Sequence, residues 1–410
     1  MMNGNQGGPM KGWLKGSTLA ALALAAALGA PIETAAQQLE WSGSTWSRLE
    51  TRHRNGDVPG GSFTGMQTRI GLSRALNADA RFFVEFQDAR IWGTERSTTA
   101  GAADNFDMHQ GYVELGHRGS SPLWLRAGRQ EMEFAEGRLV GAPVWTLTGQ
   151  SFDAVRAAWS PSDDIIVDGF ISDMGRNEVS GDTYFMGLWS EFDLGPNRSL
   201  QLFALHDRNN VALGILELGR TTVGTWYEAK SGVVTYRVEG ALQTGVVTGR
   251  NLSANMVGLR VGAPMFEGKG SATLWYDRYS GDADPGQLET RAFSNLFGRT
   301  HTFFGQADLF SQISTQTNGR GLQDVALKLG WKLPQNAMLG LDLHRFILTD
   351  ATGLAESKAA DEADLTISWP ASTGVDLLLG GSWVNGTPFL FSANGGDRLL
   401  FGFAQLRARF

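Results

Sequence analysis

The stretch LFGFAQLRARF, residues 400–410, alternates between two kinds of side chain. Every second position from Leu400 to Ala408 is apolar or small, whereas the positions between them include Gln405 and Arg407. A period of two is the pattern of a β-strand whose two faces meet different surroundings. The stretch therefore predicts a strand with one apolar and one polar face.

The same alternation recurs upstream. Clear examples lie at residues 234–243, 257–261, 272–277, 325–332 and 339–344. Short turn-like clusters separate some segments, for example at residues 195–197 and 334–336. Longer polar or glycine-rich stretches lie near residues 93–105, 132–150, 280–300, 310–322, 350–360 and 384–398. Short turns on one rim and long loops on the other are typical of outer-membrane barrels.

We therefore expect an all-β fold, a transmembrane antiparallel up-and-down β-barrel. At roughly 20 residues per strand and connection, the chain supplies about 18 strands, and 16 is the nearest alternative because bacterial barrels have even strand numbers. A soluble β-sandwich would show the same alternation. However, nearly every segment carries large apolar side chains on one face, and no second layer is implied that would cover them.

The N-terminal segment has the form of a secretory signal peptide. Lysines precede the apolar run 19–28, and small residues follow it. The run is shorter than the roughly 20 residues that a membrane-spanning helix needs. We expect cleavage after Ala36, or alternatively after Ala30, and a translation start at Met1 or Met10. The predicted parts of the chain are a signal peptide, residues 1–36, and an outer-membrane barrel, residues 37–410.

The composition excludes several classes of protein. The chain has 53 Gly but only 12 Pro and no Gly-X-Y period, so it is not collagen-like. Its 13 Trp and 23 Phe are too many for a disordered chain. The absence of Cys excludes a disulfide scaffold and thiolate metal sites. A net charge of −7 without a basic stripe argues against a nucleic-acid partner.

No motif of a known catalytic centre is apparent. The 6 His have no metal-ligand spacing, and neither a G-x-S-x-G elbow nor a Walker A loop occurs. We therefore expect no enzyme activity, no metal and no cofactor. An outer-membrane barrel enzyme, which would need Ser or Thr beside His, is the least favoured function.

Several stretches resemble known proteins. The terminal aromatic residue Phe410 resembles the end of the insertion signal of bacterial outer-membrane proteins. The motifs LRAGRQ (125–130), EGRLVG (136–141) and SFDAVR (151–156) resemble the alginate-export family of outer-membrane channels, as do YDRYSGD (276–282) and FFGQADLF (303–310). The resemblance implies a monomeric barrel of about 18 strands that passes an anionic polysaccharide through a basic constriction. The modest length of the loops argues against a built-in plug.

Candidate substrate contacts follow from the resemblance and from the alternation. The basic constriction of the family falls on Arg126, Arg129 and Arg156, although Arg129 needs a β-bulge to face inward because it is next to Gly128. Lumen-facing and lipid-facing residues alternate along a barrel strand, so polar registers predict the pore wall. The predicted substrate-contacting residues are Arg69, Arg126, Arg129, Arg156, Arg237, Arg260, Lys328 and Arg407. Arg48, Arg52 and Arg409 are also expected to point inward.

Each of these basic residues has an alternative role in an ion pair across strands, which is worth little near water. Suitable carboxylates fall in similar registers at Glu50, Asp88, Glu239, Asp277 and Asp342. The tryptophans fit aromatic girdles at the membrane interfaces. Trp124, Trp145 and Trp275 have a second interpretation, stacking on sugar rings.

The favoured function is an outer-membrane channel. It would pass an anionic polysaccharide, an acidic oligosaccharide or small anionic solutes, because arginine pairs with carboxylates and basic rings select anions. A general small-solute porin with a mixed-charge wall is the alternative. A structural barrel with a plugged lumen would give no conductance.

Overall fold

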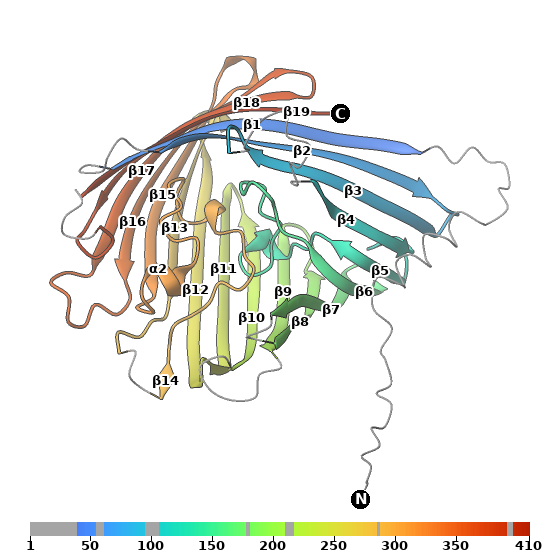
Figure 1. Ribbon diagram of the computed structural model, residues 1–410, viewed down its shortest axis with the longest axis horizontal. Coiled ribbons are helices and arrows are strands. Elements are labelled where there is room, and N and C mark those ends of the chain that lie inside the picture. Colours follow the sequence, from blue (N-terminus) through green and yellow to red (C-terminus); the bar gives the residue numbers. More distant parts are fainter. Residues whose placement is uncertain are drawn as a thin grey trace, which may run out of the picture.

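The computed structural model describes residues 39–54, 61–94, 106–177, 181–209, 217–284, 288–391 and 397–410 (Figure 1). The predicted signal peptide, residues 1–36, lies outside the described residues. Among the described residues, no helix is long and apolar enough to cross a membrane. One continuous sheet of 19 strands dominates the structure.

The barrel consists of 18 of these strands. The remaining one, β14 (Glu289–Thr290), is a two-residue strand that lies parallel to β12 within a loop. The barrel strands are β1 (Glu40–Arg54), β2 (Ser62–Ala75), β3 (Ala80–Ile91), β4 (Phe106–Leu115), β5 (Leu123–Gln130), β6 (Phe152–Ser162), β7 (Ile165–Asn177), β8 (Gly181–Asp193), β9 (Arg198–Asn209), β10 (Leu218–Ser231), β11 (Val234–Val247), β12 (Arg250–Met265), β13 (Gly270–Tyr279), β15 (Leu322–Lys332), β16 (Met338–Leu348), β17 (Lys358–Ser372), β18 (Val375–Gly386) and β19 (Arg398–Arg409). The predicted strand number and antiparallel arrangement are confirmed.

The barrel closes between its first and last strands. β19 pairs antiparallel with β1, with Thr45 opposite Ala408. Beyond this ladder, Gly43 and Phe410 exchange two backbone hydrogen bonds of 3.0 Å. Closure leaves no open sheet edge, as a bilayer requires, because lipid cannot hydrogen-bond unpaired backbone groups.

The two rims differ in the length of their connections. On one rim the strands are joined by short turns, two of which contain the 3-10 helices η2 (Phe266–Gly268) and η4 (Pro334–Asn336). The start of β1 lies on this rim, because it pairs with the end of β2 next to the short turn to β3, and the end of β19 lies beside it. Short turns face the periplasm in outer-membrane barrels, so we assign this rim to the periplasmic side.

The outward face of the wall is apolar. On β11, Val238 and Leu242 point away from the lumen and are 44% and 57% exposed, whereas the intervening Glu239 and Ala241 are buried. The same division holds on β15, where Val325 is exposed and Asp324 is buried. The predicted apolar registers therefore form the surface that faces lipid.

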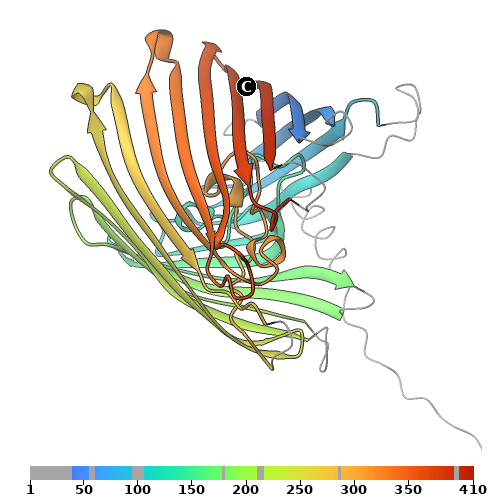
Figure 2. The same cartoon turned by 90° about the vertical axis from the view of Figure 1, so that its left-hand side faces the viewer.

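Two long connections fold into the lumen, contrary to the expectation that the loops leave it open. The first inner loop, residues 131–151, joins β5 to β6 and contains η1 (Ala135–Gly137). The second lies in the connection from β13 to β15: residues 291–321, the second inner loop, contain η3 (Thr300–Thr302) and α2 (Ile313–Gln316). Both views show coil segments and α2 within the ring of strands (Figures 1 and 2).

The two inner loops join each other and the wall. Val140 and Phe297 form an isolated parallel bridge between the loops. The side chains of Gln67 on β2 and Gln87 on β3 donate to backbone carbonyls of the first loop, at 2.6 and 2.9 Å. Gln243 on β11 donates to a carbonyl of the second loop at 2.8 Å. These contacts fix both loops inside the barrel.

Apolar side chains explain why the loops fold inward. Phe134 of the first loop stacks on the inward-facing Trp189, with ring centroids 4.9 Å apart. Phe303, Phe304 and Phe310 of the second loop are almost fully buried. Burying one such side chain is worth about 1.5–3 kcal/mol. The lumen therefore holds an aromatic core and is not lined by polar residues alone.

Several tryptophans also depart from the predicted girdles. Trp159 and Trp383 are exposed on the outward face and fit that role. Trp124 is buried on the inward face of β5. Trp145 lies in the first inner loop, and Trp275 on β13 contacts the lumen-facing Arg260. Alternation alone does not separate an interface tryptophan from one that packs inside.

Candidate functional site

An arginine cluster lies on the inner wall near the periplasmic rim. Arg126 on β5 stands directly opposite Arg156 on β6 in the strand register. Both guanidinium groups lie over the buried ring of Trp124, at 5.0 and 5.4 Å from its centroid. The structure thus brings together two of the three arginines on which the family's basic constriction was expected to fall.

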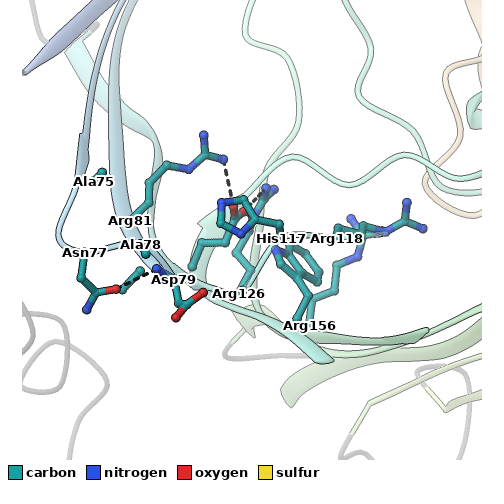
Figure 3. A pocket seen from close by; sticks show the side chains of 13 residues that line it. Ala75, Asn77, Ala78, Asp79, Arg81, His117, Arg118, Arg126 and Arg156 are labelled. Atoms are coloured by element: carbon teal, nitrogen blue, oxygen red, sulfur yellow. Dashed lines mark hydrogen bonds and ion pairs between the residues drawn. The ribbon is translucent and has the colours of Figure 1, made fainter. Parts of the chain in front are cut away.

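Two arginines that the sequence did not single out complete this cluster. Arg81 extends from β3, and Arg118 comes from the turn between β4 and β5. Arg81, Arg118, Arg126 and Arg156 surround one cavity of about 380 Å³ (Figure 3). We refer to these four residues as the arginine cluster.

Carboxylates neutralise most of the arginine cluster. Arg126 and Arg81 both bind Glu114, with Nε and Nη2 at 2.8 and 2.9 Å from its oxygens. Arg156 binds Asp168 through two hydrogen bonds of 2.7 Å. Arg118 joins Asp168 at 2.9 Å and Glu191 at 2.5 Å. Three carboxylates, Glu114, Asp168 and Glu191, thus bind the four guanidinium groups, and Asp79 lines the same cavity.

The side chains of the arginine cluster differ in their exposure to solvent. The side chains of Arg81 and Arg118 are 47% and 31% exposed, whereas that of Arg156 is only 9% exposed. The pKa of Arg118 is raised: burial works to lower it, but Glu191 and Asp168 outweigh that effect. The guanidinium of Arg118 therefore stays charged.

The other predicted substrate contacts on the inward face also bind carboxylates of the wall or the inner loops. Arg69 binds Glu131 at 2.9 Å, Arg260 binds Asp277 at 2.8 Å, Lys328 binds Asp342 at 3.0 Å and Arg407 binds Asp376 at 3.5 Å. Arg237 contacts Glu228 and Glu136. These residues face the lumen but do not form one ring with the arginine cluster. Their roles as substrate contacts stay predictions.

Arg129 does not line the lumen, contrary to expectation. β5 continues in register with both neighbours through Arg129, so no bulge turns its side chain inward. It lies on the same face as the exposed Leu123 and forms an ion pair with Asp153 at 2.8 Å. Its position is therefore on the outward face near the rim of long loops.

Arg138 anchors the first inner loop to the wall. Its guanidinium binds Glu239 on β11 at 2.5 Å, Asp277 on β13 at 3.2 Å and the hydroxyl of Tyr279 at 2.6 Å. Arg260 binds the same Asp277, so two arginines face two carboxylates. Burial alone would lower the pKa of Arg138, but these partners raise it well above its ordinary value. We call Arg138, Glu239, Asp277 and Arg260 the arginine anchor.

A second cavity, of about 690 Å³, lies between the inner loops and β17 to β19. Trp145 stacks on His301 there, with ring centroids 4.0 Å apart. Arg48 lies over the rings of Trp145 and Trp46, 3.7 Å from the centroid of Trp145. Most other lining side chains are neutral hydroxyl and amide groups, including Thr146 and Gln405. Hydroxyls, amides and an aromatic ring suit a hydroxylated solute, by hydrogen bonding and stacking.

Sequence reasoning missed Arg81, Arg118 and Arg138 for different reasons. Arg138 lies in the quoted motif EGRLVG, so the motif was a usable signal. Arg118 lies in a short turn, where strand alternation gives no orientation. In the ranges that the structure describes, no group of three or more His, Cys, Asp or Glu is placed to hold a metal ion.

Comparison with known proteins gives one sequence match and many fold matches. Residues 43–392 match the family described as alginate export. No curated protein matches the chain by sequence. Among solved porin structures, Pseudomonas aeruginosa OpdO has a TM-score of 0.65 at 13% identity, covering 91% of this chain and 97% of that one. Acinetobacter baumannii OccAB1 has a TM-score of 0.61 at 11% identity, with coverage of 90% and 97%.

A further match is P. aeruginosa OpdK, whose structure was solved with vanillate. It has a TM-score of 0.58 at 10% identity, and the match covers 90% of this chain and 98% of that one. At such low identity these structures establish the shared barrel fold and nothing about ligands.

Proposed function

The chain belongs to the alginate export family, and from this premise we propose that it is an outer-membrane channel for acidic saccharides and small organic anions. A channel rather than an enzyme is what both the family and the barrel fold indicate. The finer part of the proposal is the choice of anionic solutes.

The arginine cluster is the observation that carries this proposal. Arg81 and Arg118 are the exposed members, and Arg126 and Arg156 continue the series along the wall. Arginine binds carboxylates through two parallel hydrogen bonds. A solute carboxylate can therefore share these guanidinium groups with Glu114 and Asp168.

Partial neutralisation of the cluster suits transport better than tight binding. A conducting site must attract the solute and still release it. Four guanidinium groups share three bound carboxylates, and the carboxylate of Asp79 lines the same cavity, so the site has little net charge. We expect the exposed guanidinium groups to select anions weakly and to give brief, repeated binding events.

The test is conductance through planar bilayers. We expect the wild-type reversal potential to show anion preference, and uronate oligomers to reduce the current in a concentration-dependent manner. Arg126→Gln combined with Arg156→Gln leaves two guanidinium groups against Glu114, Asp168 and Glu191, so the preference should fall or reverse. Arg345→Gln is the matched control, because Arg345 faces outward and pairs with Asp361. Equal selectivity in all three proteins would refute the arginine cluster as the selective element.

A general small-solute porin is the second candidate, and a specific observation favours it. The predicted substrate-contacting residues that face the lumen each have a carboxylate partner, which gives a mixed-charge wall rather than an uncompensated basic ring. Block by neutral oligosaccharides as strong as block by uronates would favour this candidate. Vanillate, named with OpdK, is a useful monomeric carboxylate probe for the same comparison.

A further inference from the structure

Two acidic side chains of β17 hold a turn of the second inner loop. The backbone N–H of Ala307 donates to Glu362 Oε1 at 2.9 Å, and that of Gln306 donates to Asp364 Oδ2 at 3.2 Å. Glu362 and Asp364 are two positions apart, so they share the inward face of the strand. We call these four residues the carboxylate latch. Gly305, with φ +80°, precedes it, and a Cβ there would collide with the carboxylate of Glu362.

The two carboxylates are buried without a compensating cation. Glu362 and Asp364 are each only 2% exposed. The second oxygen of each, Glu362 Oε2 and Asp364 Oδ1, is buried and has no hydrogen-bond partner. In the part of the chain that the structure describes, neither forms an ion pair. Two neighbouring carboxylates in such a site do not both ionise, because the charges repel and lack solvation.

The charged neighbours on the adjacent strands are already neutralised by other partners. His344 on β16 stands opposite Glu362, and its Nδ1 is 2.9 Å from Asp324. Asp342 on β16 stands opposite Asp364 and is bound by Lys328 at 3.0 Å. On β18, the residue opposite Asp364 is the uncharged Ser382. Among the described residues of these strands, no Lys or Arg binds the latch, and Nε2 of His344 is buried without a hydrogen-bond partner.

Two further charged groups lie near the latch: Asp308 of the second inner loop and Arg52 of β1. Asp308 follows the latch turn in the loop, and its Oδ1 is 2.8 Å from Nδ1 of His301. Arg52 on β1 donates to the carbonyl of Ala307 at 3.0 Å and lies over the ring of Phe401. Arg52 thus grips the backbone of the turn rather than either latch carboxylate.

We propose that Glu362 and Asp364 hold one proton between them, and that this proton keeps the second inner loop docked in the lumen. The proton lies between the two oxygens that have no other partner, and it leaves one negative charge for the two amide donors. Its loss at higher pH places two unshielded charges side by side. The latch turn then leaves the wall, and solvent reaches the carboxylates. The resulting increase in conductance rests on the proposed channel function, whereas the docking does not.

Hydrogen exchange of the folded protein in detergent tests the docking directly. After correction for the intrinsic pH dependence of exchange, we expect the amides of Gln306 and Ala307 to be protected at acidic pH and to lose protection as pH rises. Glu362→Gln keeps the acceptor for Ala307 and adds a permanent donor towards Asp364. This variant should therefore retain protection at alkaline pH.

Asp361→Asn is the matched control, since Asp361 is next to Glu362 but faces outward and pairs with Arg345. It should follow the wild-type profile. Protection that is independent of pH in the wild type, or an equal shift in both variants, would overturn the proposal. Loss of protection at acidic pH on adding a chelator would also overturn it, because a metal cation would then be the shared charge.

Infrared spectroscopy of the wild type covers the case in which Glu362→Gln fails to fold. A buried protonated carboxyl has a carbonyl stretch distinct from that of a carboxylate. We expect this band to disappear over the same pH range as the exchange protection. A protonated band that is absent at every pH would refute the shared proton, whatever the protein conducts.

Discussion

The arginine anchor and the carboxylate latch hold the two inner loops by opposite electrostatic means. In the anchor, Arg138 brings a positive charge from the loop to Glu239 and Asp277 of the wall, and Arg260 balances the second carboxylate. In the latch, the loop contributes only backbone amides to Glu362 and Asp364. The first contact is complete within the chain, whereas the second needs a positive charge from solution. The first inner loop is therefore held by charges of the chain itself, whereas the docking of the second depends on a bound proton.

Removing the guanidinium of the anchor should have the largest effect. Arg138→Ala leaves Glu239 buried and unpaired, and breaking a buried ion pair in this way costs about 3–5 kcal/mol. We expect residues 131–151 to lose exchange protection and the conductance to rise. Arg299→Ala is the control, because Arg299 also binds the first loop but is more exposed. If both variants behave alike, the anchor is not what fixes the loop.

Adding a methyl group at Gly305 should break the latch alone. Its φ of +80° is strained for any other residue, and strain of this kind costs about 1–3 kcal/mol. The new Cβ also collides with the carboxylate of Glu362. In Gly305→Ala, the amides of Gln306 and Ala307 should exchange rapidly at every pH while the first loop stays protected. Loss of protection in both loops would show that they do not separate as described.

Low pH should destabilise the docking of the first inner loop without breaking the contacts of the carboxylate latch. Burial alone would raise the pKa of Glu131, but the hydrogen bond from His109 and the charge of Arg69 lower it below its ordinary value of 4.5. Its contribution to stability is therefore complete above that value and lost as pH falls through the lowered pKa. Exchange of residues 131–151 should increase below about pH 4.5, and Glu131→Gln should remove this dependence. A pH-independent wild type would contradict the assignment.

The ion pair between Arg129 and Asp153, outside the lumen, should contribute least to stability and selectivity. Arg129 and Asp153 face outward and are partly exposed, and such pairs are worth about 0–1 kcal/mol. Arg129→Ala should leave the exchange of both inner loops and the ion selectivity unchanged in bilayers. A marked change in selectivity would mean that Arg129 contacts the solute path after all.

The wall of the barrel could be predicted from the sequence, because strand alternation maps directly onto two faces. Leu242 against Gln243, and the pattern from Leu400 to Phe410, were sufficient to assign lipid and lumen sides. The opposition of Arg126 and Arg156 required pairing register as well, which alternation does not give. The family motifs and the polar register both pointed to these two residues, but neither gave their pairing.

The inner loops could not be predicted because alternation describes only strands. A loop over the rim and a loop inside the lumen both interrupt the pattern in the same way. The apolar content of FFGQADLF was the available signal, since Phe303, Phe304 and Phe310 would be poorly solvated on a rim. The pairing of Arg138 with Glu239 joins residues far apart in the chain, so only the folded barrel reveals it.

The turn at Gln306 and Ala307 also spans the join between the two ends of the chain. It accepts a bond from Arg52 on β1 and donates to β17, while β18 and β19 lie between them. These bonds form together only when the first and last strands have met. The turn thus connects strands on both sides of the closure between β1 and β19. A barrel that has not closed cannot retain these bonds. Protection of the turn is a marker of finished assembly.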